Sequence, residues 1–436
     1  DKMSIVVSEI WTYPVKGCQG IKHTEVKLTT SGLYLDRAWC VIDASGNRQA
    51  KNEAISQRRL PLLASVWVEL SQDSLTLHAP GMPSLQVPAK EGDYKDNEDV
   101  VVECGGKSTT SAGGWHLGLQ TGKSAGLSAE RWLTQYLNSG SAKTDKKPPG
   151  RYLLVRSLDE NVRKVDRFAG PKQVPFSEDL DLQRKGEASP FKFQKLNVVD
   201  TDAVRFQDMA PIHLASVQSI TDLSTKMQQL FQSSRVKPQG SSLQPDAFDP
   251  SKPDFAYPIT CFRPNIVIKG SVAWCEEDWL EIEIGHAGLF RLWKNTPRCT
   301  VPSRNPTTGG FAVNSDKFLV TRTMNKFWPE KTIDKEWGDE WQGPCFGVHI
   351  AWAPKVSAEK GEETGSAPSS VVLCVGDKLR VKKHRQAPSV LKSACSFVFS
   401  CAKTSAFPLV LAALAVFLSV YINQMYRDVP NYHWPH

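Results

Sequence analysis

Four short segments of the chain combine basic, thiol and amide side chains with turn residues. They are TYPVKGCQG (12–20), YLDRAWCVID (34–43), CFRPNIVIKG (261–270) and TPRCTVPSRNPTTGG (296–310). They supply three cations, Lys16, Arg37 and Arg263, each beside an expected strand end, where loops converge on binding sites. Guanidinium forks and ammonium groups in such places suit a ligand that carries phosphate. Any one of these cations by itself is more often a solvated side chain or half of a rim salt bridge.

Strands are expected to position most of these segments. From Ile5 onward, short apolar or alternating runs rich in Val, Ile, Trp and Tyr end at Gly, Asn or Asp, which is typical of strands. Their regular spacing favours a small barrel or sandwich. Helices are expected at 127–138, with Ser128 as N-cap, and within 210–227, from about Ser216. The runs FRPNIVIKG, WLEIEIG, LFRLWK and GDKLRVKK then predict a second β-rich domain.

The bulk composition is that of an ordinary globular protein. The 436 residues are 40% hydrophobic and 23% charged, with a formal charge of +7, and their length allows about two or three domains. A modest, diffuse charge gives no reason to expect a nucleic-acid partner. The ten cysteines stand singly, without a CxxC pair, which favours reduced thiols in a cytosolic or matrix-like compartment. No apolar signal segment follows Asp1, so we expect a start at a processing site or a trimmed end.

The last part of the chain differs from the rest. From Thr404 to Met425 there are 22 residues without a charge. At about 1.5 Å per residue, such a helix spans roughly 33 Å, enough to cross a membrane. We therefore expect one transmembrane helix; the alternative is a buried core helix, which is rarely apolar on every face. Lys and Arg gather between 378 and 403, so the folded body should lie on the cytoplasmic or matrix-like side.

Taken in order, the four segments resemble the MOSC superfamily with its N-terminal β-barrel partner, and in pattern the mitochondrial amidoxime reducing component. The shared features are Y-P-V-K with a later Cys, L-D-R ahead of an aromatic residue, F-R-P-N-I-V-I, R-C before P-x-T-G, then F-G and a terminal G-D strand. The resemblance covers most of residues 5–385. It implies a mixed, β-rich α+β fold, with an N-terminal MOSC-type β-barrel, a MOSC β-barrel domain and one C-terminal transmembrane helix.

The organisation expected on this basis follows the chain from end to end. Its parts are a MOSC N-terminal β-barrel-like domain (5–155), a connecting excursion (156–195), the MOSC domain (196–385), a basic linker (386–403), the transmembrane helix (404–425) and a short tail (426–436). The polar stretches 233–254 and 357–370 are expected to be loops.

The resemblance also implies a molybdenum cofactor, a pterin dithiolene with a terminal phosphate. Members of the family hold the pterin and phosphate with Lys and Arg side chains and ligate molybdenum with one Cys thiolate. Carried over by motif, the cofactor-binding residues are Lys16, Arg37, Arg263, Asn265 and Arg298, and the catalytic metal ligand is Cys299. A thiolate suits such a metal centre, and a neighbouring guanidinium favours the deprotonated thiol. Asp208 is a second catalytic candidate through a hydrogen bond near the cofactor, although a carboxylate before a helix is often its cap.

Three departures from the family pattern thin the polar wall expected around the cofactor. Gly17 stands where the family usually has Ser, Met209 and Ala210 replace the hydroxyl residues of D-T-S-P, and residues 294–297 lack the Cys and Ser frequent in relatives. The expected membrane anchor also lies at the opposite end of the chain from that of family members.

Two functions from different classes remain open. The first is a membrane-anchored mitochondrial oxidoreductase that reduces N-hydroxylated substrates, such as amidoximes, with electrons from a b-type cytochrome and its reductase. The second is a non-catalytic subunit of a respiratory-type membrane complex that keeps the MOSC fold; carriage of sulfur or a metal cofactor through Cys299 is a third. The first is favoured because the motif residues are all present together. It predicts that Lys16, Arg37 and Arg263 converge in space around an anion.

Overall fold

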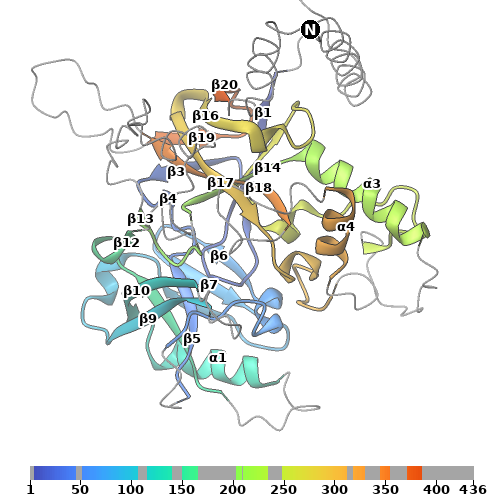
Figure 1. Ribbon diagram of the computed structural model, residues 1–436. Coiled ribbons are helices and arrows are strands. Elements are labelled where there is room, and N and C mark those ends of the chain that lie inside the picture. Colours follow the sequence, from blue (N-terminus) through green and yellow to red (C-terminus); the bar gives the residue numbers. More distant parts are fainter. Residues whose placement is uncertain are drawn as a thin grey trace, which may run out of the picture. The chain divides into compact units, whose positions relative to one another are not determined.

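Strands dominate the architecture of the chain (Figure 1). The computed structural model describes residues 4–45, 52–106, 115–139, 150–164, 203–208, 210–233, 248–311, 318–328, 344–353 and 371–384. Asp1–Lys383 form one compact unit and His384–His436 form a second. The expected linker, transmembrane helix and tail, 386–436, lie outside the described residues. Within the described ranges, no helix is both long and apolar enough to cross a membrane.

An eight-stranded sheet forms the centre of the first unit. Its strands are, in order, β2 (Ile21–His23), β1 (Val6–Thr12), β15 (Ile266–Lys269), β14 (Ile212–Ser216), β18 (Cys345–Ala353), β17 (Gly288–Pro297), β16 (Trp279–Ile284) and β20 (Leu379–His384). The apolar runs of β14 and β15 are almost wholly buried, and the two strands pair in parallel, with Leu214 beside Ile266. A parallel pair requires a crossover, which here begins with α3 (Val217–Ser233).

The two helices expected from periodicity are present. Ser216 ends β14, and its hydroxyl accepts a 3.1 Å hydrogen bond from the backbone N–H of Gln218, which caps α3. The helix expected at 127–138 is α1 (Leu127–Ser139). The assignment of Ser128 as its N-cap was wrong, because the helix already begins one residue earlier. Boundaries of this kind depend on the chain that leads into the first turn rather than on the apolar period.

The central sheet curls so that its far end returns to β1. Val6 forms an isolated antiparallel bridge with Lys378, just before β20. The backbone N–H of Val7 donates to the carbonyl of Asp377 at 2.9 Å, and that of Leu379 donates to the carbonyl of Ile5 at 2.8 Å. Apolar side chains from the curled strands form one buried cluster. These contacts, with the helices, establish the expected β-rich mixed fold.

Smaller sheets surround the central one. They are β5 (Trp39–Asp43), β11 (Tyr152–Ser157), β10 (Trp115–Ser124) and β9 (Asp99–Gly106); β6 (Trp67–Leu70), β7 (Ser74–His78) and β8 (Leu85–Pro88); β19 (Val371–Cys374), β3 (Glu25–Thr29) and β4 (Gly32–Leu33); and β12 (Arg163–Lys164) with β13 (Ala203–Val204). The apolar face of α1 is buried in the core that joins β5, β7, β8 and β11.

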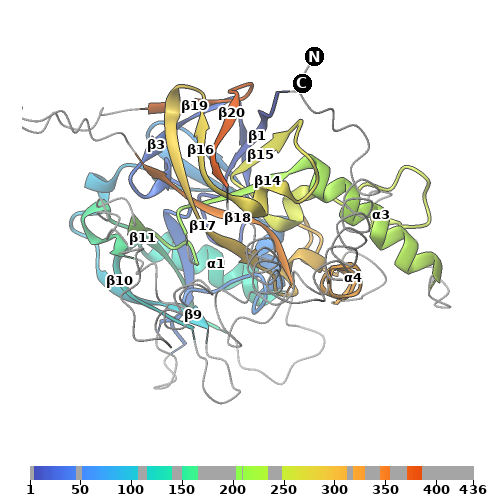
Figure 2. The same ribbon diagram turned by 45° about the horizontal axis from the view of Figure 1, so that its top comes forward.

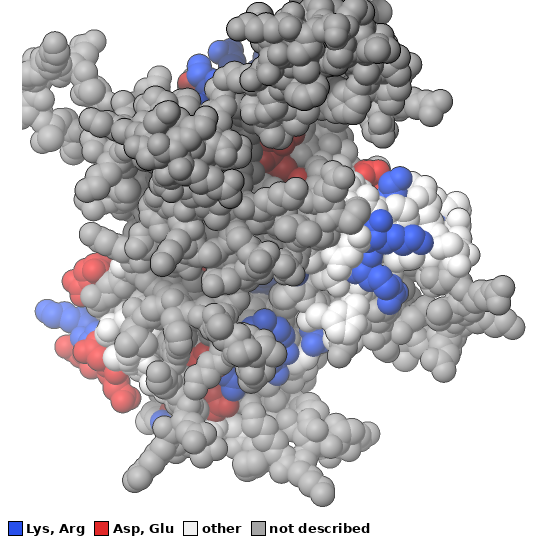
Figure 3. Space-filling view, viewed as in Figure 1, with Lys and Arg blue, Asp and Glu red and all other residues white. Residues whose placement is uncertain are grey.

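Strand pairing links segments that lie far apart in the sequence. β1 falls in the range 5–155 but pairs with β15, and β19 pairs with β3. A second helix, α4 (Leu319–Phe327), packs beside α3 over an aromatic cluster; Figure 2 shows the two helices together on one flank of the sheet. On the described part of the face in Figure 3, basic and acidic side chains form separate small groups rather than one basic surface.

Candidate functional site

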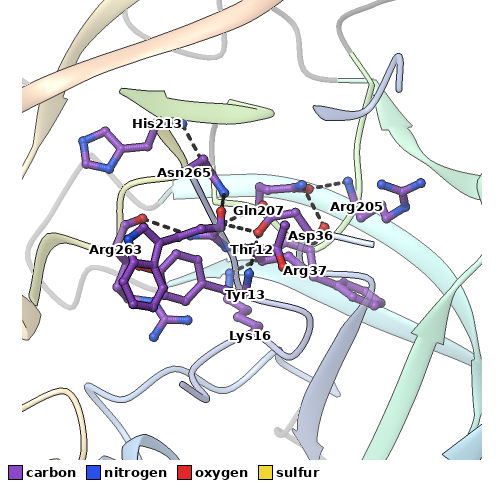
Figure 4. Close-up of polar contacts among 12 residues, drawn as sticks. Thr12, Tyr13, Lys16, Asp36, Arg37, Arg205, Gln207, His213, Arg263 and Asn265 are labelled. Atoms are coloured by element: carbon purple, nitrogen blue, oxygen red, sulfur yellow. Dashed lines mark hydrogen bonds and ion pairs between the residues drawn. The ribbon is translucent and has the colours of Figure 1, made fainter. Parts of the chain in front are cut away.

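A tyrosine after β1 gathers two of the expected cofactor-binding arginines. Tyr13 is buried, and the guanidinium carbons of Arg37 and Arg263 lie 4.4 and 4.1 Å from the centroid of its ring. One nitrogen of Arg37 also lies 3.4 Å from the backbone carbonyl oxygen of Arg263. Figure 4 shows the three side chains together, although they come from separate segments. We call them the arginine–tyrosine cluster; its π surface supports both cations.

Asp36 supplies the negative charge of this cluster. Its fully buried carboxylate accepts two hydrogen bonds of 2.6 Å from Nη1 of Arg37 and one of 2.8 Å from the backbone N–H of Tyr13. A buried carboxylate is very costly without such partners, so these bonds hold Arg37 in its orientation. The L-D-R motif therefore supplies a cation together with its own counter-charge.

Arg263 is the less satisfied of the two arginines. Its Nη1 donates to the carbonyl of Cys18 at 2.7 Å, whereas its Nη2 is buried and has no hydrogen-bond partner among the residues described. Burial, followed by the charge of Arg37, lowers the pKa of Arg263 to about 10. Its φ of 55° is uncommon for a residue with a side chain, and such angles concentrate at functional sites. Two arginines and one buried carboxylate leave an excess of positive charge that an anion would balance.

Lys16 points to a different group of atoms. Its ammonium donates to the backbone carbonyl of Phe206 at 2.8 Å and forms an ion pair with the carboxylate of Asp208. The side chain of Asp208 is 74% exposed and that of Lys16 is 11% exposed. The expected convergence is therefore divided. The two arginines meet at the tyrosine, while Lys16, in the same loop, has a counter-charge of its own.

Gly17 accounts for one departure from the family pattern. It adopts φ +87°, and a Cβ at this position would lie 3.0 Å from a methyl carbon of Leu63. Its carbonyl accepts a 2.7 Å hydrogen bond from the buried amide of Gln57. A side chain is strained at this φ, so a serine would not fit without a change in the backbone. Of the other two departures, Met209 lies outside the described residues and Ala210 is buried.

Asn265 joins three strands of the central sheet. Its side-chain oxygen accepts from the backbone N–H of His213 at 3.1 Å, and its side-chain nitrogen donates to the carbonyl of Trp11 at 3.1 Å. Its backbone N–H and carbonyl bond to the same two residues at 2.8 Å. The amide is buried, so these bonds fix where β1, β14 and β15 meet, directly beside the arginine–tyrosine cluster (Figure 4).

Cys299 is exposed in the segment that follows β17. The guanidinium of the preceding Arg298 donates to the carbonyls of Phe346 and Phe262 at 3.0 and 3.3 Å and contacts the imidazole of His213. Within the described chain its partners are thus neutral. Burial lowers the pKa of Arg298 to about 9, against the charge of a Cys299 thiolate, which raises it. Because Phe262 directly precedes Arg263, this thiol segment and the arginine–tyrosine cluster are neighbours.

The P-x-T-G run after Cys299 forms a tight loop. The side-chain oxygen of Asn305 accepts from the backbone N–H and hydroxyl of Thr307 at 2.9 and 2.7 Å. At Gly309, with φ +76°, a Cβ would lie only 1.9 Å from the carbonyl oxygen of Pro61. The motif glycine is therefore required by close backbone contact, which holds the loop against the segment before β6.

Three residues of the site were absent from the sequence-based prediction of site residues. Tyr13 and Asp36 lie inside the quoted motifs Y-P-V-K and L-D-R, where they were passed over because only the cations were weighed. His213 carried no signal beyond its place in an apolar run. Its role depends on β14 meeting β15 and β18, which spacing along the chain does not reveal.

Two domain families match the chain over most of its described length. The MOSC N-terminal beta barrel domain matches residues 4–140, and the MOSC domain matches residues 201–380. The chain belongs to the MOSC family, and the resemblance inferred from its motifs is confirmed.

The similar curated proteins are mitochondrial amidoxime reducing components. Component 2 of Rattus norvegicus is 26% identical over 308 residues, covering 70% of this chain and 68% of that protein. Component 2 of Bos taurus is 26% identical over 351 residues, covering 79% and 78%. Component 1 of Homo sapiens is 26% identical over 307 residues, covering 70% and 67%. A solution structure from Bordetella bronchiseptica, 20% identical, covers 30% of this chain and 85% of that one, but its TM-score of 0.17 carries no argument.

Proposed function

We propose that this protein is a molybdenum-cofactor reductase that acts on N-hydroxylated compounds such as amidoximes. The observation that carries the proposal is the buried, unpartnered Nη2 of Arg263 beside Arg37. An unsatisfied donor on a buried cation costs more than a neutral one, so a bound oxyanion would be strongly favoured there. The relatives named above supply the reaction class.

The residues present fit the cofactor in charge and in chemistry. A pterin phosphate would accept from Arg263, whose excess charge the protein itself leaves unbalanced. The exposed thiol of Cys299 is available as the single protein ligand to molybdenum. When bound, the cofactor would supply the redox chemistry, and the protein would orient it and set its electronic environment.

Each remaining residue has a distinct part in this proposal. Arg298 keeps a positive charge beside the thiol, which favours the thiolate needed for metal binding. Asn265 fixes the strands from which Arg263 and Tyr13 extend. Lys16 and Asp208 form an ion pair at the edge of the site, and Lys16 can turn to a phosphate only if it leaves that carboxylate.

The setting of the enzyme is part of the proposal. We infer that residues 404–425 anchor the chain in a mitochondrial membrane, in keeping with the uncharged segment and the relatives' names, and that a b-type cytochrome with its reductase donates the electrons. Carbonate extraction of membranes from cells that express the full chain tests the anchor. Release of the full-length protein, as complete as that of a variant truncated after residue 403, would refute it.

The central experiment measures metal, pterin and turnover on the full chain. Protein from cells that make the cofactor should contain about one molybdenum per chain, show the fluorescence of oxidised pterin, and reduce an amidoxime with a reduced viologen dye as electron donor. Arg263→Gln should lower the molybdenum content by about tenfold, because a charge-assisted bond to phosphate is lost. Wild-type protein without molybdenum or pterin would overturn the proposal.

A second function is favoured by one specific observation. Lys16 and Arg37 already have carboxylate partners from the protein, so part of the expected anion site is neutralised internally. A MOSC fold retained as a non-catalytic subunit of a membrane complex would have this property. Stoichiometric copurification of the wild-type chain with a large complex, without molybdenum, would support this function over the first.

A further inference from the structure

The imidazole of His213 lies between the two halves of the candidate site. His213 is buried in β14, and its Nε2 is in hydrogen-bonding contact with Nη2 of Arg298. The same Nε2 lies 3.3 Å from the carbonyl oxygen of Phe346. The ring also hydrogen-bonds to the backbone carbonyl of Arg263, which Arg37 contacts from the other side at 3.4 Å. One side chain therefore touches both the thiol segment and the arginine–tyrosine cluster.

Only one protonation state of His213 agrees with these contacts. A guanidinium donates and never accepts, so the ring nitrogen that faces Arg298 must accept and carries no proton. The approach of Nε2 to the Phe346 carbonyl is then a contact between two acceptors that share the guanidinium, rather than a hydrogen bond. The proton resides on Nδ1, which can donate to the Arg263 carbonyl. Burial, followed by the charges of Arg298 and His349, lowers the pKa of His213 well below its ordinary value.

The surrounding backbone is shaped for this ring. At Gly347, with φ +68°, a Cβ would lie 2.6 Å from Nε2 of His213 and 2.5 Å from the carbonyl oxygen of Leu214. The glycine of the F-G motif therefore leaves the space that the imidazole occupies. The backbone N–H of His213 is held by Asn265 at 3.1 Å, and the ring of His349 lies 6.1 Å away at an interplanar angle of 62°.

We propose that His213 is a positioning residue: a neutral imidazole that holds the Arg298 guanidinium and thereby fixes Cys299 relative to the arginine–tyrosine cluster. The inference deepens the proposed function and rests on it, because Cys299 matters here as the metal-binding thiol. Without the imidazole, Arg298 keeps only two backbone carbonyls, and a buried cation with so few acceptors turns toward water. The positive charge beside Cys299 is then no longer fixed.

The test follows the reactivity of the Cys299 thiol in the full chain. Wild type, His213→Leu, His213→Gln and His23→Leu are made in cells without molybdenum-cofactor synthesis, so that the thiol is free in all four. Iodoacetamide labelling of the Cys299 peptide at one neutral pH is followed by mass spectrometry. We expect His213→Leu to label at least threefold more slowly, because a fixed guanidinium promotes the reactive thiolate. His213→Gln, whose amide oxygen can accept from Arg298, should restore most of the rate.

His23→Leu is the matched control. His23 is on β2 of the same sheet, and its imidazole hydrogen-bonds to the hydroxyl of Thr12 at 2.7 Å. This variant should label at the wild-type rate. An unchanged rate in His213→Leu, or an equal loss in the Leu and Gln variants, would overturn the positioning role.

A second measurement covers the case in which His213→Leu does not fold. In ¹⁵N-histidine-labelled wild-type protein, the signal that disappears in His213→Gln should show an unprotonated Nε2 and a protonated Nδ1. The opposite tautomer would refute the proposal. Neither measurement needs molybdenum, so a wild-type protein that binds no metal would end the proposed function and still leave the role of His213 decided.

Discussion

Two sites of this molecule bury an arginine in different ways. In the arginine–tyrosine cluster, Arg37 is neutralised by the fully buried carboxylate of Asp36 and stacks on Tyr13. Beside Cys299, the guanidinium of Arg298 meets two carbonyls and an imidazole, all neutral. The first arrangement resembles a structural ion pair. The second leaves the positive charge without a partner, next to an exposed thiol.

The difference separates stability from reactivity. A buried ion pair whose two members are adjacent in sequence forms as soon as the local turn forms, and breaking it leaves an uncompensated charge. A buried cation held by neutral acceptors stabilises less, but its field acts on any nearby group that can become negative. Substitutions at the first site should therefore change the free energy of unfolding, and those at the second should change chemistry.

The largest effect is expected at Cys299. Cys299→Ser should lower amidoxime reduction by about 100-fold or more, because removing even an outer-shell partner of a metal ligand costs about 10- to 100-fold. The substituted side chain is exposed, so the urea midpoint should not change. Turnover with a reduced viologen dye measures the effect. Cys374→Ser, at the end of β19, is the control, and substantial turnover in Cys299→Ser would remove the thiol from the reaction.

Next in size is the loss of stability when the buried ion pair is broken. Asp36→Asn leaves Arg37 without its carboxylate and should cost about 3 kcal/mol of unfolding free energy. Urea unfolding followed by tryptophan fluorescence measures it. Adding Arg37→Met should recover part of the loss, because the uncompensated charge is then gone. A cost below about 1 kcal/mol, within the usual range of surface ion pairs, would mean that the pair is not structural.

The second site should reveal itself through pH. Burial keeps His213 neutral in the folded chain and lowers its pKa, whereas in the unfolded chain the value is about 6.5. The unfolded chain therefore takes up the proton first, so this contribution to stability is complete above about pH 6.5 and is lost as the pH falls. One proton corresponds to about 1.4 kcal/mol per pH unit.

Urea unfolding at several pH values between 7.5 and 5 measures this loss for wild type and His213→Gln. We expect the wild type to lose more stability than the variant over this range, since the glutamine side chain does not titrate. Parallel curves for the two proteins would show that His213 is not held neutral.

The smallest effect is expected for Asp208→Asn. The carboxylate of Asp208 is 74% exposed, so its ion pair with Lys16 is screened by water and should contribute less than about 1 kcal/mol. Removing the charge frees the Lys16 ammonium for an anion, and molybdenum content should be unchanged or higher. Urea unfolding and metal analysis measure the two effects. A loss of molybdenum would instead make Asp208 part of cofactor binding.

Local patterns were a good guide to several features of this molecule. The apolar periods located α1 and α3 and many of the strands, because burial of one face is written into residue spacing. The motifs selected Arg37, Arg263 and Cys299, which the structure brings into neighbouring parts of one site. They could not indicate that Lys16 would pair with Asp208 or that the amide of Asn265 would be used by two backbones. Those outcomes depend on which strands meet.

The sequence by itself determined the family, the β-rich class and the basic and thiol groups available for chemistry. Only the tertiary structure decided how the charges are balanced, since Asp36 pairs locally while Arg298 receives His213 from β14 and Phe346 from β18. The physical reason is that secondary-structure preference is a local property of side-chain spacing, whereas the partner of a buried charge is set by strand register, and a shift of one residue turns each side chain to the other face.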